Sequence, residues 1–142
     1  MKRASLIASA LLLLVLGGLR VADANKTHEA QLTGQAEVGG GDPDGSGRAL
    51  VNYSPSSNRI CFTLDVSGID TPTAANIYRG AAGTDGSIVV SLAPLTGNSS
   101  IGCVENVDPE LLKDIAKNPG NYYVNVLNSQ YPNGAIRGQL GR

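Results

Sequence analysis

The sequence is short of the residues that most catalytic and metal sites need. Among its 142 residues it has no tryptophan, one phenylalanine, one histidine and two cysteines. His28 is the sole imidazole for any Ser-His-Asp or Cys-His arrangement, and no Gly-x-Ser-x-Gly elbow surrounds a serine. Two cysteines and one histidine cannot close a zinc site without a carboxylate. These shortages argue against nucleophilic catalysis and against a cysteine-rich metal centre.

Neither positive nor negative charge is in clear excess. The 11 lysines and arginines and the 12 aspartates and glutamates are scattered, and the formal net charge is −1. No basic stripe with interleaved aromatic residues is present, so we expect no nucleic-acid partner. The glycines at 80–86 match neither a Walker loop nor a dinucleotide fingerprint, which argues against nucleotides.

Only the N-terminus carries a long hydrophobic run. A basic start, the apolar run at 6–16 and the small-x-small pattern at 22–24 are typical of a signal peptide. We therefore predict a signal peptide at 1–24 and an exported domain at 25–142, secreted or periplasmic, with no transmembrane segment after cleavage. Arg20 makes the cleavage site imperfect, and an uncleaved anchor is the alternative.

Export makes a disulfide between Cys61 and Cys103 the default expectation. In the chain-entropy model, closing a loop of about 42 residues stabilises the fold by roughly 4 kcal/mol. The alternative is a pair of free thiols or a cysteine-based metal site.

Alternating apolar and polar residues predict a β-rich fold. At 60–66, Ile60, Phe62, Leu64 and Val66 alternate with polar residues or cysteine, as in a half-buried strand. Further strand-like segments lie at 29–38, 48–53, 74–79, 87–92, 101–104, 122–127 and 135–140. Turn signals every 8 to 12 residues or so favour a sandwich or Greek-key barrel of about seven strands.

One segment has the pattern of a helix. At 108–117, Asp108 suits the N-cap and Pro109 the first helical position, while an Asn-Pro-Gly run follows the segment. We predict a short crossover helix that turns Leu111, Leu112 and Ile115 toward the sheet.

Six fragments occur in an order that resembles a known family. They are GDPDGSG, ICFTLDVSGI, RGAAGTDG, IGCV, NPGNYYVNV and YPNGAIRGQL. Together they resemble the CHRD domain, the module first described in chordin, over roughly residues 28–140. The resemblance implies an extracytoplasmic, immunoglobulin-like β-sandwich and supplies no enzyme activity.

The chain departs from the family pattern at three positions. The family usually has Ala-His-Ile-His-x-Gly and a later histidine, whereas this chain has Asn76, Tyr78 and Leu127. An amide, a phenol and an isobutyl group do not replace imidazole as copper or zinc ligands. We therefore expect no transition metal at these positions, and we expect His28 at the surface.

Two interpretations of the 74–86 segment remain open. Strand alternation directs Asn76 and Tyr78 to one face and Ile77 to the core. The two polar side chains then either bond neighbouring backbone or, with Asn125, line a polar pocket beneath the glycine loop. The glycines of that loop would let backbone N–H groups approach an anion. The predicted pocket consists of the family-motif positions Asn76, Tyr78, Arg79, Asn125 and Leu127.

Charged residues suggest three further arrangements. Asp42, Asp44 and Ser46 have the spacing with which a calcium loop begins, although an ordinary turn explains them equally well. Arg79 and Asp85 flank the glycine loop and are placed to form an ion pair. A carboxylate pair drawn from Glu37, Asp65, Asp85 and Glu105 stays open, because their spatial relations are unknown.

We predict a non-catalytic extracytoplasmic binding or structural module. Its expected partner is a protein or a component of the envelope or matrix, and we expect no cofactor. The alternatives are a metal-binding or redox protein distantly like copper-zinc superoxide dismutase, and a calcium-dependent adhesion module.

Overall fold

Residues 26–141, which the computed structural model describes, form eight β-strands, one α-helix and three short 3-10 helices. In chain order these are β1 (Lys26–Thr33), η1 (Gly34–Ala36), β2 (Ser46–Ser54), η2 (Pro55–Ser57), β3 (Arg59–Ser67), β4 (Ala74–Arg79), β5 (Ser87–Ser91), β6 (Ser99–Val104), α1 (Pro109–Lys117), η3 (Pro119–Asn121), β7 (Tyr122–Leu127) and β8 (Ile136–Gln139). The predicted signal peptide lies outside the described residues. Within them, no helix has the length and apolarity needed to cross a membrane.

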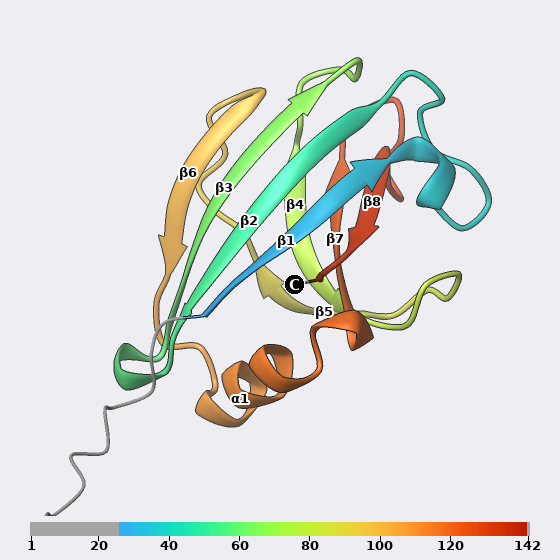
Figure 1. Ribbon diagram of the computed structural model, residues 1–142. Coiled ribbons are helices and arrows are strands. Elements are labelled where there is room, and N and C mark those ends of the chain that lie inside the picture. The colour runs from blue at the N-terminus through green and yellow to red at the C-terminus, as the bar shows by residue number, and fades with distance from the viewer. Residues whose placement is uncertain (1–25, 142) are drawn as a thin grey trace, which may run out of the picture.

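All eight strands belong to one antiparallel sheet with the order β5-β4-β7-β8-β1-β2-β3-β6. The sheet curves strongly, so that the half containing β1, β2, β3 and β6 faces the half containing β4, β5, β7 and β8 (Figure 1). The result is a near-closed, barrel-like sheet with two facing layers. The predicted all-β class is confirmed, with eight strands where about seven were expected.

Side chains alternate between the inside and the outside of the curved sheet, because successive strand residues point to opposite faces. In β3, Ile60, Phe62 and Leu64 are buried, whereas Cys61 and Thr63 occupy the outer face. Corresponding positions of the other strands complete one core, which includes Ala30, Leu32, Ala49, Val51, Tyr53, Ile77, Val124, Val126 and Ile136. The outer face is therefore left for polar side chains, and the candidate site lies there.

Helix α1 crosses one end of the barrel-like sheet and carries the chain from β6 to β7 in the opposite half (Figure 1). Its start is the predicted one: Pro109 is the first helical residue, and the Asp108 carboxylate accepts a 2.9 Å hydrogen bond from the Glu110 N–H. Leu112 and Ile115 are buried in the core, which they close at this end. The predicted crossover helix is confirmed.

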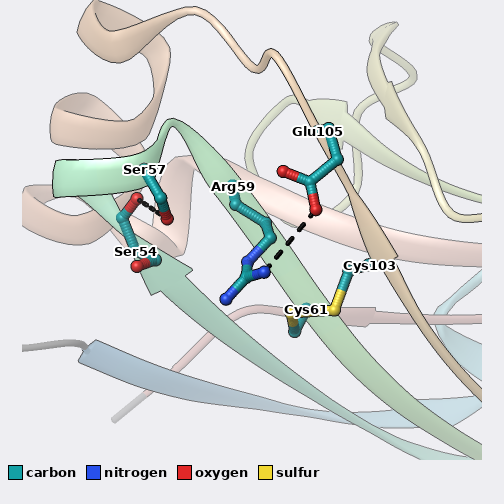
Figure 2. The surroundings of a disulfide bond; sticks show 6 residues. All are labelled: Ser54, Ser57, Arg59, Cys61, Cys103 and Glu105. Atoms are coloured by element: carbon teal, nitrogen blue, oxygen red, sulfur yellow. Dashed lines mark hydrogen bonds and ion pairs between the residues drawn. A yellow bond between two sulfur atoms is a disulfide. The ribbon is translucent and has the colours of Figure 1, made fainter.

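The disulfide between Cys61 of β3 and Cys103 of β6 is confirmed (Figure 2). The two residues lie directly opposite each other, and their Cα atoms are 4.0 Å apart. Arg59 and Glu105 form an ion pair on the same two neighbouring segments, with a 3.6 Å N–O distance. Because β6 is an edge strand paired only with β3, these bonds anchor the sheet at its edge. A disulfide indicates an oxidising, extracytoplasmic environment.

The first strand is shorter than the predicted 29–38, because β1 ends at Thr33. The Thr33 hydroxyl accepts a hydrogen bond from the Ala36 N–H, and the chain turns into η1. A Cβ on Gly34 would lie 1.7 Å from the backbone oxygen of Asp42, so only glycine allows this contact. The contact folds the 34–42 segment back toward the sheet and brings Glu37 to the outer face of β7.

Candidate functional site

Strand β4 places its side chains as alternation predicts. Ile77 is fully buried in the core, whereas Asn76 and Tyr78 lie on the outer face of the sheet. The Asn76 amide donates a 3.3 Å hydrogen bond to the Tyr78 hydroxyl, and Asn76 lies opposite Asn125 of β7. The two polar side chains therefore bond each other rather than neighbouring backbone, and they lie on the same outer face as Asn125.

Three side chains from three neighbouring strands stack on this outer face. Tyr78 of β4 and Tyr123 of β7 are parallel within 6°, with ring centroids 5.0 Å apart. The guanidinium of Arg137, on β8, lies 3.4 Å from the Tyr123 centroid. The Tyr123 hydroxyl accepts a hydrogen bond from the Gly86 N–H, which attaches the glycine loop to the stack.

Arg137 is the most deeply buried charge among the described residues, with 1% of its side chain exposed. Its Nη2 donates hydrogen bonds to the carbonyl of Ala81 (3.0 Å) and to the side chain of Gln139 (3.4 Å). Its Nη1 lies 3.7 Å from the Asp85 carboxylate and makes no hydrogen bond within residues 26–141. A guanidinium held between loop and sheet in this way fixes the glycine loop over β7 and β8.

Glu37 reaches the same face from the segment that follows η1. It is 8% exposed, and Oε2 accepts a 3.3 Å hydrogen bond from the Asn125 amide, itself 4% exposed. Glu37 Oε1 and Asn125 Oδ1 have no hydrogen-bond partner in the described part of the chain. A Cβ on Gly134 would lie 2.5 to 2.7 Å from the Glu37 carboxylate oxygens and from Asn125 Oδ1, so glycine makes room for both oxygens.

Burial changes the acidity of this carboxyl group. Loss of hydration raises the pKa of Glu37 to about 7. The Arg137 guanidinium and the hydrogen bond from Asn125 act in the opposite direction, and the Asp85 charge adds to the increase. Glu37 therefore changes its charge near neutral pH, while its own Oε1 and the neighbouring Asn125 Oδ1 lack partners within residues 26–141.

These residues surround a pocket of about 420 Å³, which we call the outer-face pocket. It is lined by Glu37, Val38, Tyr78, Asp85, Gly86, Tyr123, Asn125, Leu127, Pro132 and Asn133. A second pocket of about 350 Å³ shares Glu37 and Val38 with the first and also includes Arg137 and Gln139. Glu37 thus lines two hollows.

The structure brings together part of the predicted pocket. Tyr78, Asn125 and Leu127 line the outer-face pocket, and Asn76 donates a hydrogen bond to the Tyr78 hydroxyl. Arg79 points elsewhere: its guanidinium lies 3.8 Å from the Asp114 carboxylate and 5.3 Å from the Tyr122 centroid.

The expected ion pair between Arg79 and Asp85 is therefore wrong, since Asp85 pairs with Arg137 instead. Arg79 is the last residue of β4, and on the face that it shares with Ile77 it meets helix α1. The glycine loop also differs from the expected anion cradle. The Gly80 and Gly86 N–H groups already donate to the Asn121 carbonyl and to the Tyr123 hydroxyl.

The sequence analysis did not assign Tyr123 or Arg137 to the site, and it considered Glu37 only as a member of a possible carboxylate pair. Alternation from Val124 and Val126 places Tyr123 on the outer face, so a signal for it was present. Strand alternation gives no such signal for Glu37, because this residue lies in a loop.

The segment of the possible calcium loop contains a turn closed by an aspartate side chain. The Asp42 carboxylate accepts a 3.1 Å hydrogen bond from the Asp44 N–H, and the Ser46 hydroxyl lies 3.0 Å from that of Ser67. Ser46 is therefore engaged across the β2–β3 pair. In residues 26–141, no three His, Cys, Asp or Glu side chains are grouped closely enough to hold a metal ion.

His28 is buried rather than at the surface as expected, with 8% exposure. It occupies an interior-facing position of β1, next to the ring of Tyr53 at 5.3 Å. Its Nδ1 lies 2.8 Å from the carbonyl oxygen of Gly141, so the C-terminal residues cover it. Within residues 26–141, His28 belongs to no group of three residues that could hold a metal ion.

Comparison with known proteins places the chain in a family. The model of the CHRD domain matches residues 28–140, a range that includes both cysteines and the residues of the outer-face pocket. No curated protein and no solved structure matches the chain. Because the matched range covers nearly the whole sequence, the chain belongs to the CHRD domain family.

Proposed function

We propose that the protein is an exported, non-catalytic binding module that acts outside the cytoplasm through the outer-face pocket. The observation that carries this proposal is that Glu37 and Asn125 both line one hollow, and each has a buried oxygen without a partner within the described residues. Buried polar atoms are normally hydrogen-bonded, and a pocket with a few unsatisfied polar groups is typical of a ligand site.

Export is supported by two independent features. The N-terminal 24 residues have the signal-peptide pattern, and the Cys61–Cys103 bond fits an oxidising compartment. The partner that we propose is an extracytoplasmic protein or a component of the envelope or matrix, which presents a polar group to the pocket.

One observation favours a second candidate, a glycoside-cleaving activity. Glu37 and Asp85 are carboxylates in the same pocket, and the raised pKa of Glu37 suits a general acid. Binding is the better-supported function, because Asp85 is paired with Arg137 and one Glu37 oxygen accepts from Asn125. Incubation with a panel of nitrophenyl glycosides decides between them: hydrolysis that Glu37→Gln abolishes would favour the enzyme.

The test of the binding function is an NMR screen. Oxidised, isotope-labelled protein, residues 25–142, is mixed in turn with simple amines, polyols and sugars, carboxylates and phosphates. We expect at least one class to shift the backbone signals of Tyr78, Tyr123 and Asn125, and Asn125→Ala to abolish the shifts.

Asn52→Ala is the matched control, because Asn52 donates to Thr27 on the opposite half of the sheet. Shifts confined to residues outside the pocket, or none with any class, would contradict the proposal.

A further inference from the structure

We infer that the outer-face pocket binds a protonated primary amine, which forms an ion pair with Glu37 and a hydrogen bond with Asn125. This inference rests on the proposed function and specifies its ligand.

The unpartnered atoms of the residues that line the pocket are acceptors, and both are buried beside Gly134, so a ligand reaches them only where this cover shifts. Glu37 Oε1 and Asn125 Oδ1 lack partners within residues 26–141, and Asp85 adds a carboxylate at the rim that is 77% exposed. The backbone N–H of Gly86, which an anion would need, already donates to Tyr123. A ligand that completes this pocket must therefore donate hydrogen bonds, and an ammonium group has three N–H donors and no acceptor.

The charges around Glu37 also favour a cation. The charged or titratable groups that face it are Arg137 from β8, Asp85 from the glycine loop, Tyr78 from β4 and Tyr123 from β7. The single guanidinium lies over Tyr123 and pairs with Asp85. With Glu37 ionised, the cluster has one uncompensated negative charge. A cation at Glu37 Oε1 would balance it and return the group to its ionised form.

The apolar residues that line the outer-face pocket fit the alkyl chain of an ammonium ligand. Val38, Leu127 and Pro132 line the pocket beside the ring of Tyr78, and its volume of about 420 Å³ accommodates a short methylene chain. An aromatic ring next to the charged end adds a cation–π contribution. A metal ion is the weaker choice, because the described residues offer no group of three carboxylate, imidazole or thiolate ligands.

The probe for this inference is n-butylammonium, titrated at pH 8 into isotope-labelled oxidised protein and compared with 1-butanol and butyrate. The three share a chain length and differ in charge. We expect saturable shifts of the Tyr78 and Asn125 signals with the amine, and binding at least tenfold weaker, by the usual difference for charge-assisted hydrogen bonds, with the alcohol and the acid.

Two variants make the test specific. Glu37→Gln keeps the shape of the side chain and removes its charge, so the amine is expected to bind roughly tenfold more weakly. Glu105→Gln is the matched control on the other half of the sheet, where Glu105 pairs with Arg59, and should bind as the wild type does. Signal dispersion in the same spectra verifies that each variant is folded.

Binding should also depend on pH. Because the free Glu37 carboxyl has a pKa of about 7, only a few per cent of it is ionised at pH 5.5. The apparent affinity for the amine is then expected to fall roughly thirtyfold between pH 8 and pH 5.5. Glu37→Gln should show no such fall.

Equal binding of butanol, stronger binding of butyrate, or amine binding that Glu37→Gln leaves unchanged would overturn the amine inference. If the NMR screen still finds another class at the same residues, the binding function stands and its ligand is different. Once the amine binds, N-acetyl-lysine methylamide and putrescine distinguish the source. Preference for the first supports a lysine side chain of a partner protein, and preference for the second supports a free polyamine.

Discussion

Replacing Glu37 by glutamine measures how strongly this fold opposes an ionised carboxylate under its loops. The pKa of the buried group is about 7, against an ordinary value of 4.5. Below pH 4.5 the carboxyl is neutral in the folded and the unfolded chain, so burial carries no charge penalty. As the pH rises from 4.5 to 7, the unfolded chain ionises first and the free energy of unfolding decreases. Above pH 7 both states are ionised and the loss, about 3 kcal/mol for this displacement, is complete.

Glutamine resembles the neutral carboxyl and does not titrate. We therefore expect the free energy of unfolding of Glu37→Gln, relative to that of the wild type, to increase by about 3 kcal/mol between pH 4 and pH 8.5. The assay is urea unfolding at a series of pH values, with free energies extrapolated to water. Glu105→Gln, an exposed counterpart whose side chain is 57% accessible, controls for a general effect of removing a glutamate. A stability difference between wild type and Glu37→Gln that stays constant across the series would refute the reasoning from burial.

The other predictions concern the sheet and its ligands. Replacing Cys61 and Cys103 together by alanine should lower the free energy of unfolding by up to about 4 kcal/mol in urea, and a loss under about 1 kcal/mol would contradict the anchoring role of the bond. Leu112→Ala should cost about 2 to 5 kcal/mol in the same assay, because it empties a fully buried position under α1; a smaller cost would mean that the helix does not close the core. Gly138→Ala should prevent folding, judged by circular dichroism, since its Cβ would lie 2.0 Å from a backbone oxygen of β1, whereas Gly120→Ala, with open space around it, should fold normally. Protein stripped with chelator and dialysed against copper, zinc and calcium should retain no stoichiometric metal by elemental mass spectrometry, and retained copper or zinc would contradict this expectation.

Alternation and turn chemistry predicted most of the elements, because they depend on local rules. The period of two fixed β4 and β7 at their observed bounds, and the Asp-Pro start fixed helix α1. The disulfide was predicted from the expected export and from the presence of two cysteines. The sheet register places Cys61 opposite Cys103.

The site was less predictable, because it depends on contacts between distant segments. Glu37 reaches Asn125 only because the chain folds back where Gly34 meets Asp42, and no side-chain pattern marks a backbone contact. Arg137 lies on the outer face of β8 next to the core residue Ile136, yet the glycine loop buries it through contacts from Ala81 and Asp85. Burial by loops, rather than strand position, decided which polar residues became the site.

The place of β8 in the sheet has a consequence for how the protein is made. This last strand is not at an edge: it lies between β7 and β1, and so joins the two halves (Figure 1). During synthesis, β1, β2 and β3 can pair as soon as they emerge, but β7 has no strand link to β1 until residues 136–139 are available. Contacts that join the two ends of a chain form late and slowly. A chain of this topology therefore completes its sheet only after β8 is available, although β8 follows every other strand in the sequence.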